Sequence, residues 1–210
     1  KRPISAGSQR FIWGDLLMPE STIPSCNHLL SQMEVIEISD IPSIELYMDQ
    51  VTTLMETKLS VFKRNEEDKI LTKTMINNYA KARLFPPPKK KKYGRSHVLL
   101  LILIYHLKSV LSISDIYTLL LPINEALEKD EQAPLLYDVY NAFLDIQKTL
   151  KHTTAENPLG IETILQQIQK NRTQENAAIL SVLSWALLAN CAKRVAEYHL
   201  DTRFPKTGKK

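Results

Sequence analysis

Apolar residues recur at steps of three and four positions along most of this chain, whereas glycine is scarce, with five among 210 residues. The spacing gives each segment one apolar stripe, which is typical of amphipathic helices. The scarcity of glycine argues against sandwiches, barrels and phosphate-binding loops, because these depend on glycine-containing turns. The hydrophobic fraction of 44% is ordinary for a globular protein. The sequence therefore predicts an all-α fold with a sizeable core.

The predicted helices divide the chain into four parts. Residues 1–40 are expected to form an arm packed on the body, with a short helix over His28–Ile38. Residues 41–121 are expected to form a helix-turn-helix module, residues 122–204 a C-terminal helical bundle, and residues 205–210 a tail. We expect longer helices at about residues 43–62, 73–84, 95–111, 112–121, 134–151, 160–172 and 175–198.

Local signals place several of these helix ends. Thr72 can cap the second long helix, and Pro86-Pro87-Pro88 stops it, because proline cannot continue the hydrogen-bond ladder. Ser112-Ile113-Ser114-Asp115 resembles a capping box, and Pro122 is expected to end or kink the helix that it starts. The first long helix is predicted from one apolar stripe, made of Ile44, Met48, Val51, Leu54, Met55, Leu59 and Phe62.

Positive charge is concentrated in one stretch of the chain. Residues 58–97 contain twelve lysines and arginines but three acids, Glu66, Glu67 and Asp68, so this stretch carries +9 and the remainder carries −5. A basic module set in an acidic body suits a surface that binds a polyanion.

The same stretch predicts how duplex DNA would be bound. The outer face of the helix over 73–84 offers asparagine amides, which can pair with adenine, and the lysine run after the prolines offers phosphate neutralisation. Tyr93 and Arg95 then lead into the next helix. The expected DNA-binding residues are Thr72, Lys73, Thr74, Asn77, Asn78, Lys81, Arg83, Lys89, Lys90, Lys91, Lys92, Tyr93 and Arg95.

A family resemblance rests on the residues from Ile70 to Val98, with the run Leu-Phe-Pro-Pro-Pro-Lys-Lys-Lys-Lys-Tyr-Gly-Arg, and on Leu111-Ser-Ile-Ser-Asp-Ile116. They resemble the MerR-like helix-turn-helix and, more closely, a bacterial family called domain of unknown function 1836. The resemblance covers about Ile41–Leu121. It implies a winged helix-turn-helix, with the helix over 73–84 in the major groove and Lys89–Tyr93 as the wing, and a homodimer that reads palindromic double-stranded DNA.

The sequence also departs from the MerR pattern. An Arg-Tyr-Tyr-Glu signature is usual in the recognition helix of MerR proteins, and here Asn77, Asn78, Tyr79 and Ala80 occupy those positions. Arg83 replaces the glycine that typically ends the helix. A second hypothesis therefore stays open, that of a helical protein-interaction or scaffold module that has lost DNA binding.

Other chemistries find little support in the sequence. The five histidines do not cluster with cysteines or carboxylates at ligand spacing, and neither cysteine has an evident base partner, so we expect no metal, no cofactor and no enzymatic activity. Cys26 and Cys191 suit a reducing, cytoplasmic compartment. The longest apolar run, Val98–Leu107, is short of the about 20 residues that a membrane span needs.

Four features also have alternative interpretations. The lysine run over 89–92 could be a solvated loop, and Asn77 and Asn78 could be surface residues that read no base. Tyr79 and Tyr93 could pack the hinge between helix and wing. Trp185 and its apolar neighbours could line a pocket for an unknown small-molecule effector, although a buried core helix is the more ordinary interpretation.

Overall fold

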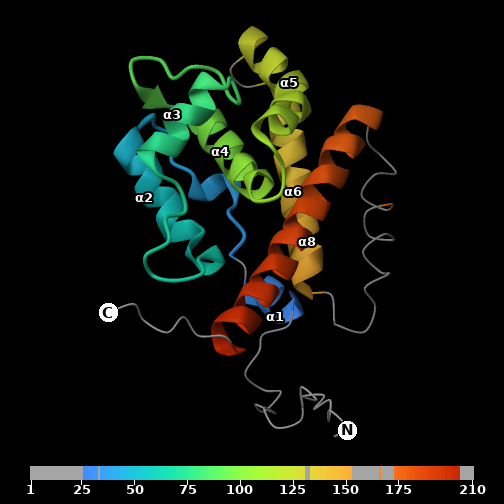
Figure 1. Cartoon of the computed structure of the whole chain (residues 1–210). Helices are drawn as coiled ribbons and strands as arrows, with labels where there is room; N and C mark the ends of the chain where they lie inside the picture. The colour runs from blue at the N-terminus through green and yellow to red at the C-terminus, as the bar shows by residue number, and fades with distance from the viewer. Residues whose placement is uncertain (1–25, 33, 131–132, 153–165, 167–172, 204–210) are drawn as a thin grey trace, which may run out of the picture.

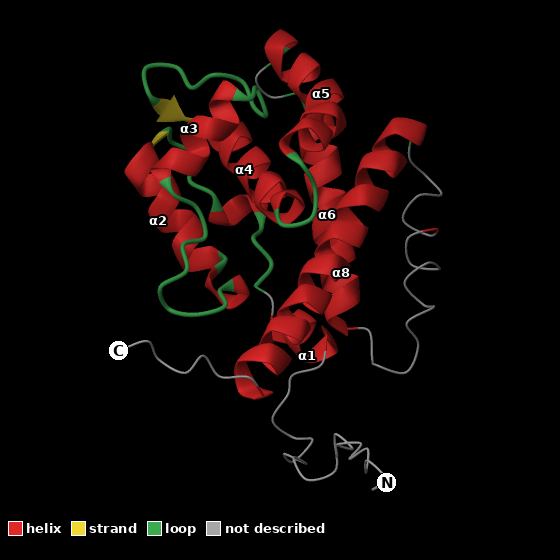
Figure 2. Cartoon of the chain, viewed as in Figure 1, coloured by secondary structure: helices red, strands yellow, loops and turns green. Residues whose placement is uncertain are grey.

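The computed structural model describes residues 26–32, 34–130, 133–152, 166 and 173–203 (Figure 1). Within these ranges the chain is predominantly helical, as the sequence predicts, with one two-stranded sheet (Figure 2). The longer elements, in chain order, are α1 (Cys26–Gln32), β1 (Leu46–Tyr47), α2 (Met48–Lys58), α3 (Lys73–Lys81), β2 (Lys92–Tyr93), α4 (Arg95–Lys108), α5 (Ile113–Lys129), α6 (Pro134–His152) and α8 (Gln174–Arg203). Short 3-10 turns cover Ile38–Asp40 and Ser60–Phe62.

Helix α4 is the centre of the molecule. Every side chain from Val98 to Ile104 is buried, and so are His106 and Leu107. A helix that is apolar all round must be covered on all sides. Accordingly, α4 contacts α5, α6 and α8 on one side and β2 on the other. The expected boundaries of this helix, 95–111, are close to those observed.

The C-terminal helices form a bundle on α4. Helix α6 contacts α1, α4, α5 and α8, and its side chains Val139, Tyr140 and Phe143 are buried in the shared core. The Tyr140 hydroxyl donates to the Ile36 carbonyl at 2.9 Å, and Leu30 and Ile36 are themselves buried. The described part of the N-terminal arm is therefore packed on the body, although its helix covers Cys26–Gln32 and not His28–Ile38.

The first long helix starts later than the sequence predicts. Residues Leu46 and Tyr47 form β1, and α2 begins at Met48. Ile44, a member of the predicted apolar stripe, is 67% exposed. The cause is a contact with a distant segment, because β1 pairs with β2 in antiparallel register. Leu46 lies opposite Tyr93, and Tyr47 lies opposite Lys92.

The capping box at Ser112 is confirmed. The Ser112 hydroxyl accepts from the Asp115 backbone amide at 3.2 Å, and the Asp115 carboxylate accepts from the Ser112 amide at 3.3 Å. Pro122 does not end the helix, because α5 continues to Lys129. The domain boundary predicted between residues 121 and 122 therefore falls inside a helix. Three further expectations, the helix over 160–172, residues 1–25 of the arm and the tail, lie largely or wholly outside the described residues.

One stretch within the described residues, Asn176–Thr202 of α8, is long and apolar enough to cross a bilayer by length and composition. Polar residues are interspersed along it, so it contains no long uninterrupted apolar run. Its most apolar window is 44% buried, and α8 packs on α1, α4 and α6. Core helices of soluble proteins meet the same criteria, so the stretch is weak evidence for a membrane span.

Candidate nucleic-acid interface

Helix α3 presents a polar face to solvent. The Thr72 hydroxyl caps its N-terminus by accepting from the Met75 backbone amide at 3.1 Å, as the sequence predicts. Ile76 and Tyr79 are buried against the core. The side chains on the opposite face are all exposed, namely Lys73, Thr74, Asn77, Asn78 and Lys81. The outward amides are therefore accessible, and Thr72 itself is a partly buried capping residue.

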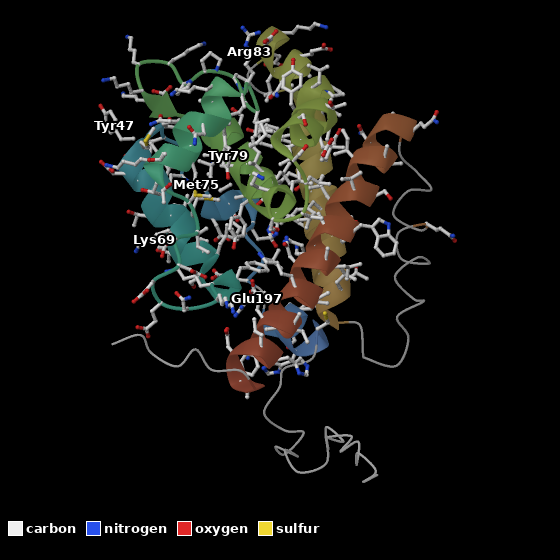
Figure 3. All side chains as sticks on the ribbon, in the orientation of Figure 1. Tyr47, Lys69, Met75, Tyr79, Arg83 and Glu197 are labelled. Carbon is white, nitrogen blue, oxygen red and sulfur yellow. The ribbon has the colours of Figure 1, made fainter. Side chains whose placement is uncertain are left out.

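The C-terminus of α3 is closed by a left-handed residue. Arg83 has a φ of 56°, and the next amide, that of Leu84, donates back to the Tyr79 carbonyl at 3.0 Å. This is the Schellman arrangement, in which glycine is the usual left-handed residue. Asn124 of α5 reaches across to donate to the Leu84 carbonyl at 3.2 Å. The Arg83 side chain is exposed at this end of the molecule (Figure 3).

The lysine run forms a tight reverse turn. The Lys92 amide donates to the Lys89 carbonyl at 2.9 Å, and the two residues between them are both left-handed, with φ of 50° at Lys90 and 61° at Lys91. Positive φ at both central positions is the signature of a type I′ hairpin turn. Lys89, Lys90 and Lys91 are exposed, and the loop lies at the same end of the molecule as α3 (Figure 1).

An aromatic cluster of Phe85, Tyr93 and His97 lies next to this turn. Tyr93 is buried, with its ring 5.7 Å from that of His97 and 6.4 Å from that of Phe85. The His97 imidazole bridges the segment: Nδ1 accepts from the Gly94 amide at 3.1 Å, and Nε2 lies 3.0 Å from the Pro86 carbonyl, to which it can donate. These contacts fix the start of α4 to the proline run and therefore hold the turn in place.

A family model described as domain of unknown function (DUF1836) matches residues 36–143, just over half of the chain. The chain belongs to this family. No curated protein and no solved structure shows significant similarity to it. The DUF1836 region starts before β1 and includes α2, α3, the lysine turn, α4, α5 and the first half of α6. It therefore extends beyond the module expected to end at residue 121 and includes part of the C-terminal bundle.

The cations of the DUF1836 region differ in whether they form ion pairs. Lys58 pairs with Glu34 of the arm and Arg64 with Asp201 of α8, whereas the pair of Lys63 with Glu56 lies within the module. Among the described residues, by contrast, Lys81, Arg83, Lys90 and Lys91 form no ion pair. Exposed cations without an ion pair in the described structure thus occur on α3 and in the loop that follows it, and Lys69 is another, in the segment before α3.

Two lysines of the expected interface have acidic neighbours. Lys73 pairs with Asp49, both on the exposed surface. The Lys92 ammonium lies 3.8 Å from the Glu45 carboxylate and 5.7 Å from the centre of the Tyr47 ring, so it packs across β1. These acids reduce the positive potential at that edge of the site.

The structure gives two expected contact residues a different position. Tyr93 is 3% exposed, which agrees with the hinge interpretation. Burial raises the pKa of both the Tyr79 and the Tyr93 phenols, so neither carries charge at neutral pH. Arg95 is partly buried and donates from Nη2 to the Ile41 carbonyl at 3.1 Å. Asn124 and His97 were not anticipated, because their roles depend on contacts that no local pattern reveals.

Proposed function

We propose that this chain is a DNA-binding transcriptional regulator with a MerR-like winged helix-turn-helix, acting on double-stranded DNA in the bacterial cytoplasm. Helix α3 enters the major groove, and the wing over Lys89–Tyr93, which contains the lysine turn, contacts phosphates. The observation that carries the proposal is the joint exposure of the α3 amides and of the unpaired cations of the following loop at one end of the molecule.

The chemistry of the two parts is complementary. Asn77 and Asn78 present amides, which can donate to and accept from an adenine edge at the same time. The lysines of the wing supply charge without sequence information and are the part that fixes position on the backbone. In duplex recognition, some contacts read the bases and others position the protein on the backbone. A helix that carries the amides, followed by a rigid turn that carries the lysines, suits these two tasks.

Residues on the outer face of α8 support a homodimer. Ala178, Trp185, Ala189, Ala192 and Ala196 are exposed, and Val182 is partly buried. With Val182 included, they recur at alternating steps of four and three, the spacing that forms a seam between paired helices. Trp185 is 50% exposed. A second copy packed along this seam would cover it, and a two-fold dimer would read a palindromic site.

Binding to a pool of random duplexes over a range of salt concentrations tests the proposal. The wild-type protein should bind with an affinity that falls steeply with salt, and selection from the pool should yield a palindrome. Asn77→Ala with Asn78→Ala should lower the preference for the selected site while leaving non-specific affinity within about threefold. Glutamine at Lys90 and Lys91 should weaken binding to all sequences and reduce the salt slope.

The competing scaffold hypothesis predicts a different result. Binding to DNA would then be weak and insensitive to salt, and the lysine variant would match wild type. For the dimer, sedimentation equilibrium should give twice the chain mass, and Trp185→Glu should give monomers. A wild-type protein that stays monomeric at tens of micromolar would overturn the dimer without affecting the test of DNA binding.

A further inference from the structure

A cavity of about 320 Å³ lies between the inner side of α3, the segment 62–70, α4 and α8. Its size is within the range of sites for small molecules, about 300–1,000 Å³. Aromatic and aliphatic side chains contribute one part of the wall, among them Met75 and Tyr79 of α3 and Tyr105 of α4. The labelled side chains of Lys69, Met75, Tyr79 and Glu197 surround this region in Figure 3.

Cations dominate the polar part of the wall. The wall contains one acid, Asp68, and five cations, namely Lys63, Lys69, Lys108, Lys193 and Arg194. Lys63 pairs with Glu56, while Lys193 and Arg194 share Glu197, so these three are partly neutralised. Lys108 donates to the Leu111 carbonyl at 3.3 Å, and Lys69 forms no ion pair among the described residues. The wall therefore retains a positive excess.

Arg194 adds a donor that has no acceptor among the described residues. Its Nη1 donates to Glu197 at 2.8 Å, but its buried Nε has no hydrogen-bond partner in the described part of the chain. A buried donor without a partner costs free energy, and a ligand acceptor would remove that cost. Asn190 and Ser109, which also line the cavity, bond to each other, and Asn190 also donates to the His106 carbonyl at 2.8 Å. That side of the wall is therefore fixed.

We propose that this cavity binds a small organic anion, with an aromatic or apolar body and a phosphate or carboxylate group, and that the bound anion stabilises α3 from its inner side. The body would contact Met75, Tyr79 and Tyr105, and the anionic group would lie among Lys69, Lys193 and Arg194. The site differs from the one anticipated around Trp185, which does not line this cavity.

The cavity and the candidate interface use opposite faces of one helix. Met75 and Tyr79 are one turn apart and face inward, whereas Asn77, Asn78 and Lys81 face outward. The other wall belongs to α8, and Arg64 joins the intervening loop to that helix through two hydrogen bonds to Asp201, of 2.9 and 2.6 Å. An occupant would thus bridge α3 and α8. If the proposed DNA binding holds, anion binding and DNA binding are coupled reciprocally.

Fluorescence titration with 2-naphthyl phosphate tests the site directly, and 2-naphthol serves as its uncharged counterpart. The phosphate should bind with one site per chain and at least about fivefold more tightly than the naphthol. Lys69→Gln with Lys193→Gln, two exposed positions, should weaken the phosphate by about tenfold and leave the naphthol unchanged. Lys129→Gln with Lys151→Gln, which removes the same charge outside the cavity wall, should have no effect.

Hydrogen exchange gives the second readout without DNA. At a concentration near the wild-type Kd, 2-naphthyl phosphate should slow exchange of the α3 amides in wild type and much less in the Lys69/Lys193 variant. Equal affinity for phosphate and naphthol, or equal loss in both lysine variants, would overturn the anion site. Unchanged α3 exchange at saturation would overturn the stabilisation of α3. Either result is independent of whether the protein binds DNA, and a protein that binds the phosphate but no duplex would refute only the proposed function.

Discussion

In the lysine turn, one pair of substitutions should raise stability and weaken the proposed DNA binding. Lys90 and Lys91 both have positive φ, at 50° and 61°. An L-residue in this conformation costs roughly 1–2 kcal/mol, whereas asparagine and glycine adopt it readily. Lys90→Asn with Lys91→Gly should therefore stabilise the fold by about 1–2 kcal/mol, after allowing for the larger entropy that glycine loses on folding. For a chain of this size the melting temperature should rise by roughly 2–8 °C.

The same change removes two exposed charges from the proposed phosphate-binding surface. If both lysines contact phosphates, the slope of log affinity against log salt should fall by up to about 1.8. Thermal unfolding by circular dichroism and duplex binding by fluorescence anisotropy measure the two effects separately.

Glutamine at both positions is the matched control, because it removes the charge and keeps the strained backbone. That control should lose affinity to the same extent with an unchanged melting temperature. An Asn-Gly variant no more stable than the Gln-Gln variant would refute the assignment of the turn. Wild-type affinity and salt slope in both variants would refute the wing as a phosphate contact.

Three further changes test the frame around the site by denaturant unfolding. Thr72→Ala removes the acceptor for the Met75 amide and should destabilise the protein by about 1 kcal/mol, and Thr72→Ser should restore most of the loss. Arg83→Gly should stabilise by about 1 kcal/mol, because φ at that position is 56°; a loss of stability would contradict the Schellman assignment. Burial lowers the pKa of His106 from its ordinary 6.5 to about 4, so the neutral form stabilises the fold above pH 6.5. That contribution, up to about 3 kcal/mol, is lost as pH falls from 6.5 towards 4, and His106→Leu should flatten the profile over this window.

The parts of the fold that the sequence predicts well are those set by neighbouring residues. The cap at Thr72, the capping box at Ser112 and the all-round apolar character of α4 each depend on interactions within a turn or two of helix. The outward face of α3 follows from helical periodicity for the same reason. The sequence therefore predicts correctly that Lys73, Asn77 and Lys81 are accessible.

The errors come from contacts between distant segments. Leu46 and Tyr47 form a strand because Lys92 and Tyr93 lie beside them, about 45 residues later in the chain. Of the two outcomes predicted for Pro122, an ended helix or a kinked one, the first is wrong, because α5 continues to Lys129 although an interior proline costs about 3 kcal/mol. The following turns bury Ile123 and Leu127, each contributing about 1.5–3 kcal/mol, which is enough to offset that cost.

The role of each cation also depends on contacts with distant segments. The sum over residues 58–97 treats all cations alike, but Lys58, Lys63 and Arg64 are paired with acids, and Lys58 and Arg64 connect the module to the arm and to α8. Their carboxylate partners Glu34 and Asp201 lie outside the basic stretch. Only the three-dimensional arrangement separates these structural cations from those of α3 and the wing.

Backbone strain provides an independent argument for where the function lies. Within the described residues, Arg83, Lys90 and Lys91 are the three non-glycine positions with positive φ, and all three lie between α3 and α4. Glycine or asparagine would be more stable at each, by about 1 kcal/mol. The chain instead has an exposed cation without an ion-pair partner in the described structure at every one of them. Strained residues of this kind are concentrated at functional sites, where a functional role can offset the lost stability. A cation at each of these three conformationally unsuitable positions therefore supports the proposed contact with a polyanion.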